Sequence, residues 1–265
     1  MLKFENNNVS NAADVIVANP NYGDSALANN LGSVGLDSLG HVAPLPGTAE
    51  EVASIAPLLS NATFLTEGNA TETALKAIQS PRILHLATHG FFLPDVERPD
   101  YHANIGLLAS DGPIVTATAT EQTIEDPLLR SGLALAGFNP RTSGDEDGVF
   151  TALEAANLNL TGTQLVVLSA CDTGLGDIAS GEGVYGLRRA FSIAGAETQL
   201  MSLWQVSDFG TQSLMTNYYE NLTSGMGRSE ALRTAQLEMI NSNSDYAHPY
   251  YWAAFILSGD WRPLE

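Results

Sequence analysis

Short apolar runs alternate with helix-like segments along nearly the whole chain. The runs have the length of strands, are rich in Val, Ile and Leu, and are bounded by Gly, Asn and Pro. The segments between them space their apolar residues as one face of a helix does. Strands that alternate with helices are typical of a parallel sheet covered by helices on both faces. The pattern therefore predicts an α/β protein, a three-layer αβα sandwich with a mostly parallel central sheet of about six strands.

Each expected element has a definite range. Strands are expected at residues 13–18, 62–66, 82–89, 164–171, 198–204 and 252–258, with a small β insertion at 104–109 and 132–137. Helices are expected at 48–59, 71–80, 181–194, 208–222 and 228–240, and a short one after Thr151. Thr48 with Glu51 and Thr151 with Glu154 have the spacing of capping boxes, which mark helix starts. Residues 1–12 are polar and predict a flexible tail or linker remnant, so that 13–265 form one domain.

The charge balance narrows the classes of partner. The 265-residue chain has 30 acidic against 11 basic side chains, a formal charge of −19. Such a surface repels nucleic acid and anionic lipid, so we expect neither as a partner; it favours solubility, and it attracts basic peptides or a cation. A single cysteine excludes an internal disulfide and fits a reducing compartment. With no signal pattern in the first residues, we expect a cytoplasmic protein.

Two of the expected strands end in reactive side chains. The run 82–90 carries His89 and then Gly90, and the run 164–171 ends in Cys171, the only cysteine. The carboxyl ends of parallel strands meet at one edge of a sheet, where ligands bind. A thiol and an imidazole at that edge are the minimum set for cysteine nucleophilic catalysis. The plain alternatives are a small buried hydrophobe for Cys171 and a hydrogen-bonded structural imidazole for His89.

Two other motif matches do not hold. His85 and His89 invite a zinc site, but four residues along a strand separate side chains by about 13 Å, and the zincin Glu is missing after His85. The glycines of 181–186 match the dinucleotide pattern G-x-G-x-x-G. This copy does not follow directly on a strand, and no acidic residue ends the next one, so a tight turn before a helix is the better interpretation.

Five segments, in order, resemble the CHAT domain, a caspase-like module usually found with tetratricopeptide repeats. They are 85–92, 168–174, 181–191, 202–208 and 248–253, within a likeness that covers roughly 14–263. The resemblance implies the caspase–hemoglobinase fold, related to caspases, metacaspases and separase. It also implies that His89 is the catalytic histidine and Cys171 the nucleophile, with the amides of Gly90 and Cys171 as the oxyanion hole.

The resemblance says little about substrate specificity. The residue two before the cysteine is an aspartate that reads basic P1 side chains in metacaspases and a glutamine in caspases, but here it is Ser169. We expect Asp172 and Asp208, with Asp177, as candidates to bind Lys or Arg. Ser202 and Trp204, near a strand end beside the nucleophile, are further candidates to line a substrate subsite. Asp172 also disfavours the adjacent thiolate unless His89 is protonated or the carboxylate points away.

The resemblance implies a cysteine endopeptidase that acts on a protein or peptide substrate. Family members usually carry repeats, so a tetratricopeptide-repeat domain or separate chain is the expected regulator, and a zymogen that needs activation is an expected form. The alternative is a catalytically silent CHAT module that acts as an interaction or signalling scaffold. No cofactor or metal is expected; modulation by calcium stays open as an alternative, although no motif in the sequence supports it.

Overall fold

The computed structural model describes residues 9–24, 39–93, 127–169, 171–172, 182–204, 206–242 and 244–265. For 171, 172 and 182–185 it describes the backbone only. The predicted tail 1–12 and the predicted strand 104–109 therefore lie largely or wholly outside the described residues. Everything below refers to the described ranges.

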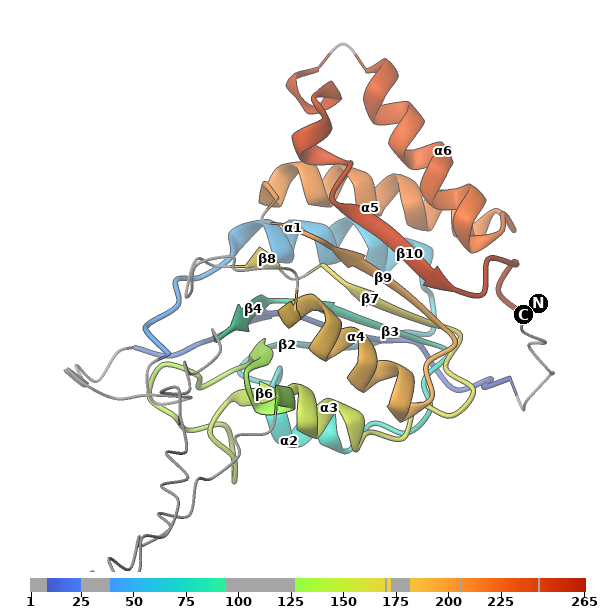
Figure 1. Cartoon of the computed structure of the whole chain (residues 1–265). Coiled ribbons are helices and arrows are strands. Elements are labelled where there is room, and N and C mark those ends of the chain that lie inside the picture. Colours follow the sequence, from blue (N-terminus) through green and yellow to red (C-terminus); the bar gives the residue numbers. More distant parts are fainter. Residues whose placement is uncertain are drawn as a thin grey trace, which may run out of the picture.

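A six-stranded sheet crosses the centre of the molecule (Figure 1). Its order is β10–β9–β7–β3–β1–β2, and every pair is parallel except β10 with β9. This confirms the predicted mostly parallel sheet of six strands. The strands are β1 (Val15–Pro20), β2 (Thr63–Glu67), β3 (Ile83–Ala87), β7 (Leu165–Leu168), β9 (Thr198–Ser202) and β10 (Phe255–Gly259).

Helices cover both faces of this sheet, which completes the predicted three layers (Figure 1). One layer holds α1 (Pro46–Ile55), α5 (Asp208–Thr223) and α6 (Arg228–Asn241); the other holds α2 (Glu72–Lys76), α3 (Ala152–Ala156) and α4 (Glu182–Ala194). Successive strand residues point to opposite faces, so each strand serves two cores. On β3, Ile83 packs with the α1–α5–α6 layer, and Leu84 with the α2–α3–α4 layer. Short 3-10 segments lie at Ala56–Leu58, Pro127–Leu129, Asp245–Ala247 and Pro249–Tyr251.

A second, smaller sheet continues from the carboxyl ends of β3 and β7. Its order is β6–β5–β4–β8, with β4 (His89–Phe92), β5 (Ser131–Ala134), β6 (Val149–Thr151) and β8 (Cys171–Asp172). The prediction that His89 and Cys171 end strands of the central sheet was wrong. β3 stops at Ala87 and β7 at Leu168, and both reactive residues open strands of the second sheet. β5 agrees with the predicted strand 132–137 to within a few residues.

Hydroxyl side chains mark the places where the chain crosses from one sheet to the other. After β3, Thr88 Oγ1 lies 2.9 Å from the hydroxyl of Tyr22 and also donates to the carbonyl of Ala134. After β7, Ser169 keeps one ladder bond, from its N–H to the carbonyl of Leu86 (3.1 Å). A strand tolerates a single hydroxyl residue, so the sequence pattern showed no break at either crossing.

The two predicted capping boxes have different outcomes. The box at Thr151 is confirmed: its hydroxyl accepts from the N–H of Glu154, whose carboxylate accepts from the N–H of Thr151. The box at Thr48 and Glu51 is wrong, because α1 begins at Pro46 with no side-chain cap. Proline suits the first turn of a helix since its missing N–H would have no partner there. Glu51 instead turns into the protein, where its carboxylate accepts from Ser169.

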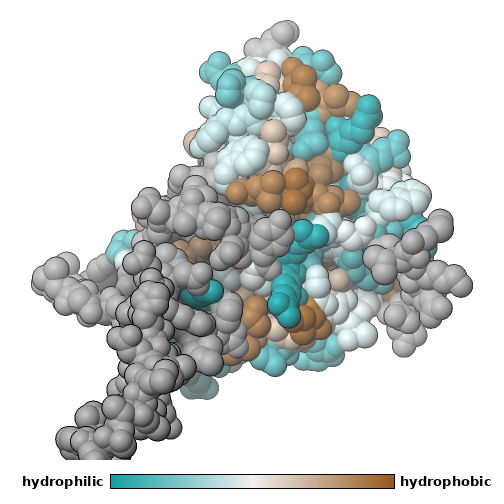
Figure 2. All heavy atoms as spheres, viewed as in Figure 1, coloured by the Kyte–Doolittle hydropathy of each residue, from teal (hydrophilic) through white to brown (hydrophobic). Residues whose placement is uncertain are grey.

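On the face in view, apolar residues lie in several separate groups, the largest at the level of β9 and β10, with polar residues between them (Figure 2). None of the described helices is both long enough and apolar enough to span a bilayer.

Candidate active site

His89 and Cys171 open neighbouring strands of the second sheet. β4 and β8 are parallel, and their register pairs His89 with Cys171 and Gly90 with Asp172. Neighbouring strands lie about 4.8 Å apart, so the two backbones are adjacent at this point. The structure therefore brings together the two residues that the sequence singled out, although by a second sheet rather than by the ends of the central strands.

The imidazole of His89 is held at one nitrogen only. It is buried, and Nε2 lies 2.6 Å from the carbonyl oxygen of Ala43. A carbonyl can only accept, so Nε2 carries the proton and Nδ1 has a lone pair. Nδ1 is buried and has no hydrogen-bond partner among the described residues. The ring of Tyr22 packs beside the imidazole, with 5.2 Å between the ring centres. The arrangement leaves a fixed imidazole with one basic nitrogen unused.

Burial lowers the pKa of His89, because the charged imidazolium loses solvation. The hydrogen bond to Ala43 and the negative charge of Asp208 oppose this effect and raise the pKa, but they are the smaller causes. The imidazole is thus neutral at neutral pH, with Nδ1 able to accept a proton.

The carbonyl that orients His89 belongs to a stiff segment. Ala43 precedes Pro44, and Pro46 begins α1 two residues later. Proline fixes its own φ and restricts the residue before it to extended conformations. The acceptor for Nε2 is therefore preorganised by the covalent chain.

A small pocket lies between the first turns of α1 and α5 and the end of β7. Its lining includes two of the predicted substrate-binding residues, Ser169 and Asp208, and the buried hydroxyl of Thr211, which has no hydrogen-bond partner among the described residues. The two helices come very close here, since a Cβ on Gly47 would lie 2.2 Å from the Cβ of Asp208. The remaining lining residues are Leu45, Gly47, Thr48 and Glu51.

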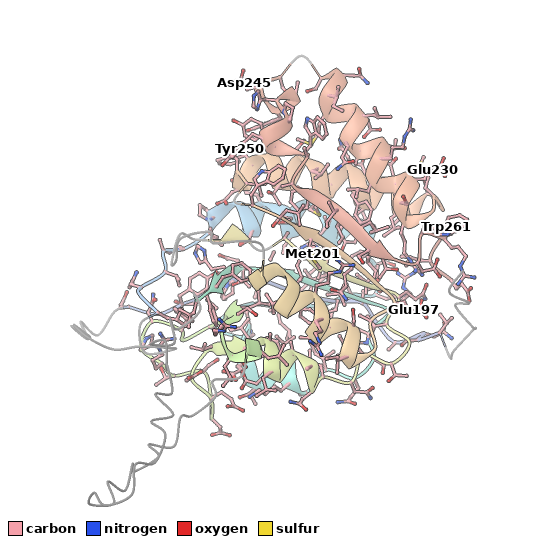
Figure 3. All side chains as sticks on the ribbon, viewed as in Figure 1. Glu197, Met201, Glu230, Asp245, Tyr250 and Trp261 are labelled. Atoms are coloured by element: carbon pink, nitrogen blue, oxygen red, sulfur yellow. The ribbon has the colours of Figure 1, made fainter. Side chains whose placement is uncertain are left out.

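The other predicted binding residues lie around the same end of the sheet. Ser202 is the buried last residue of β9, and Trp204, just beyond it, is 37% exposed with its indole N–H 3.4 Å from the carbonyl of Tyr250. Tyr250 lies at this end, whereas Glu197 and Trp261 lie at the opposite end (Figure 3). Asp172 pairs with Gly90 in the ladder. Asp177 is outside the described residues.

A cluster of three carboxylates is the one arrangement among the described residues with metal-ligand spacing. Glu72, Glu146 and Glu154 place oxygens within 4.8 Å of one another. The amino group of Lys76 already lies among them, at 2.8, 2.9 and 2.8 Å. A fixed ammonium supplies the positive charge that a metal would bring, so this cluster is an internal ion-pair network.

Sequence reasoning missed Ala43 and the buried contacts of His85, and it misassigned Glu51 to a capping box. A main-chain carbonyl leaves no signal in a sequence. Glu51 had one: it lies four residues before Ile55 on the buried face of α1, where a charged side chain needs a buried partner. That partner includes His85, whose Nε2 lies 2.9 Å from Glu51 Oε1.

These observations define an α/β protein with a thiol and an oriented imidazole on adjacent strands beside a small pocket. The CHAT domain family matches residues 2–260, and the chain belongs to this family. It is 26% identical over 219 residues to tetratricopeptide repeat protein 28 of Homo sapiens, and 27% over 229 residues to the Mus musculus protein of the same name. Each match covers 82% of this chain but only 8% or 9% of the relative.

Two solved structures match this chain with TM-scores below 0.5. The Arg-specific cysteine proteinase gingipain R superposes with a TM-score of 0.49 and 12% identity, over 96% of this chain and 47% of that one. A complex of the RgpB pro- and mature domains of Porphyromonas gingivalis gives a TM-score of 0.46 and 11% identity, over 95% and 48%.

Proposed function

We propose that the chain is a cysteine endopeptidase in which Cys171 is the nucleophile and His89 the general base. The observation that carries this proposal is the register of β4 with β8, which pairs the two residues, together with the Nδ1 of His89, which has no partner in the part of the chain that the structure describes. An imidazole tied at Nε2 to a carbonyl presents Nδ1 for proton transfer, which is the role that a thiol nucleophile requires of its base.

The reaction follows from these positions. His89 Nδ1 takes the proton of the Cys171 thiol, and the thiolate attacks the peptide carbonyl carbon. The carbonyl oxygen becomes an oxyanion, for which the amides of Gly90 and Cys171 are the proposed donors. His89 returns the proton to the leaving amine, and water then hydrolyses the thioester. A neutral His89 before attack agrees with the direction of its pKa shift.

The acidic pocket supports a preference for a basic P1 side chain. Asp208 lines this pocket and its charge also acts on His89, so the two groups are close enough to interact. We expect peptides with P1 Arg or Lys to react faster than those with P1 Asp or Ala. Asp208→Asn should reduce this preference, and Glu230→Gln, an exposed residue in the first turn of α6 on the side of Trp261 (Figure 3), should not. Equal reaction of Arg, Asp and Ala peptides with the unaltered protein would contradict the preference.

A repeat domain or partner chain is the proposed regulator. The support is that both relatives are named tetratricopeptide repeat proteins and that this chain corresponds to a small part of each. The proposal also includes a form that is inactive until such a partner acts, so the test of activity includes the chain with and without a repeat protein from the same source.

Labelling with an electrophilic peptide probe, followed by intact mass, tests the proposed function. Because Cys171 is the only cysteine, one added probe mass reports one site. We expect the unaltered protein to be labelled, Cys171→Ala to remain unlabelled, and His89→Ala to label far more slowly. Equal labelling of His89→Ala, or no labelling with the repeat partner present, would favour the silent scaffold instead.

A further inference from the structure

Four buried side chains meet on the sheet face beneath α1 and α5, just before the segments that carry His89 and Cys171. His85 of β3 and Tyr219 of α5 are fully buried, and Glu51 of α1 and Ser169 after β7 are 1% and 4% exposed. They come from four separate elements. The proposed bond-making and proton-transfer steps use none of them, although Glu51 and Ser169 also line the small pocket.

These side chains form one connected hydrogen-bond network around the imidazole of His85. Nδ1 lies 2.9 Å from the hydroxyl of Tyr219, and Nε2 lies 3.2 Å from Ser169 Oγ. Ser169 Oγ in turn donates to Glu51 Oε2 at 3.2 Å. The second carboxylate oxygen, Oε1, lies 2.9 Å from Nε2 without a hydrogen-bond donor, so this contact is electrostatic.

The chemistry of the partners gives the network a direction. Ser169 O–H donates to the carboxylate of Glu51, which only accepts, so Ser169 Oγ accepts from His85 Nε2–H. With the proton on Nε2, the lone pair of the ring is on Nδ1, which accepts from the phenol of Tyr219. Each hydroxyl and each ring nitrogen has a defined role. Removal of one link leaves buried polar groups without partners.

The network joins every segment that sets the geometry of the proposed dyad. His85 lies on the strand that leads to His89, and Ser169 lies two residues before Cys171. Glu51 belongs to α1, which begins three residues after Ala43, the acceptor for His89. Ser169 lies in the short segment between β7 and β8, and its hydroxyl is hydrogen-bonded there just before the nucleophile.

We propose that His85 and Ser169, held by Glu51, are positioning residues that fix the spacing of His89 and Cys171. The inference rests on the proposed function for the identity of the dyad. The structural part of the inference does not depend on that function: the imidazole of His85 connects the two crossings between the sheets to each other and to α1. Loss of the Ser169 hydroxyl should let the Cys171 segment move relative to His89 while the two cores stay packed.

Ser169→Ala is the decisive variant, with Tyr219→Phe as its control. Tyr219→Phe removes a bond from the same imidazole, but on the side away from the strand crossings. With a peptide electrophile, we expect Ser169→Ala to lower the maximal rate of inactivation about tenfold at unchanged half-saturation. Tyr219→Phe should change that rate less than twofold, even if it lowers the thermal stability as much as Ser169→Ala does. Ser169→Thr keeps the hydroxyl and should restore the rate.

A second measurement needs no reaction with peptide. Methyl methanethiosulfonate caps the Cys171 thiol as a mixed disulfide, and the ring signals of His89 are followed by NMR. We expect capping to shift these signals in the unaltered protein and in Tyr219→Phe, and to shift them less than half as much in Ser169→Ala. If capping shifted the His89 signals of Ser169→Ala as much as those of the unaltered protein, the inference would be overturned. An equally reduced shift in Ser169→Ala and Tyr219→Phe would also overturn it. A missing peptide reaction with intact NMR shifts would count against the proposed function only.

Discussion

His85 and His89 lie four residues apart, both are buried, and they differ at their hydrogen bonds. Both ring nitrogens of His85 have partners, and its surroundings extend the bonding to Glu51 through Ser169. His89 is bonded at Nε2 alone, and its Nδ1 is buried without a partner among the described residues. Buried polar groups are nearly always paired in folded proteins, so an exception calls for an explanation.

The difference assigns the two imidazoles opposite uses. The fully bonded one contributes to stability, because each partner would otherwise be buried alone. The half-bonded one has a nitrogen without a partner among the described residues, and we propose that this nitrogen accepts the proton of the Cys171 thiol. Alanine substitutions at these two positions have the largest expected effects, at His89 on reactivity and at His85 on stability.

His89→Ala should abolish most reactivity while the fold persists. We expect labelling by the peptide electrophile to fall by about 10²-fold or more, since that is the usual contribution of a general base. The free energy of unfolding should change by about 1 kcal/mol or less, because groups at active sites are seldom optimised for stability. A loss of stability in proportion to the loss of labelling, measured by urea denaturation, would remove the contrast between the two histidines.

His85→Ala should show the reverse balance. It leaves the hydroxyl of Tyr219 without its partner, removes the imidazole beside Ser169 and Glu51, and creates a cavity. We expect a cost of about 3 kcal/mol in the free energy of unfolding. Glu51→Gln should cost less, because a neutral amide is cheaper to bury than a charged carboxylate. A stable His85→Ala protein would mean that the network does not support the fold.

The pH dependence of stability should distinguish His89 from His85 further. The pKa of His89 is lower in the folded protein than its usual 6.5, so the folded state resists protonation. Its contribution to stability is present above the unfolded pKa and is lost as the pH falls through that value toward the folded pKa. Between pH 7.5 and 5, the unaltered protein should therefore lose more stability than His89→Ala does. Parallel curves for the two proteins would contradict the burial of His89.

The smallest expected effect concerns the acceptor of His89. Pro44→Ala frees Ala43 from its extended conformation without removing any side chain that contacts the imidazole. We expect labelling to slow about threefold, with a stability cost of about 0.4–1 kcal/mol from the more flexible unfolded chain. A labelling rate equal to that of the unaltered protein would show that the segment is fixed by packing alone.

The layers of the fold were predictable from the sequence, and the crossings between sheets were not. Alternation of apolar runs and helices predicted six strands and their helices, because burial on both faces selects continuous Val, Ile and Leu. The break at Thr88 is made by hydrogen bonds to Tyr22 and Ala134, which lie far away in the sequence. Local patterns carry no record of such partners.

Part of the candidate site was predictable for a related reason. His89 and Cys171 stand out because reactive side chains follow apolar strands. Their register is a property of β4 and β8 together, which no single run encodes. The capping box expected at Thr48 failed because Glu51 forms bonds across the protein instead of within its helix turn. Spacing alone cannot distinguish these two uses of a glutamate.

The acceptor at Ala43 has a consequence for mutational surveys of this chain. Every amino acid has a main-chain carbonyl, so no substitution at position 43 deletes the group that holds His89. A survey of single replacements will score this position as tolerant, and its tolerance will say nothing about its contribution to reactivity. Only a change in backbone path, by insertion, deletion or replacement of the neighbouring prolines, can displace the oxygen.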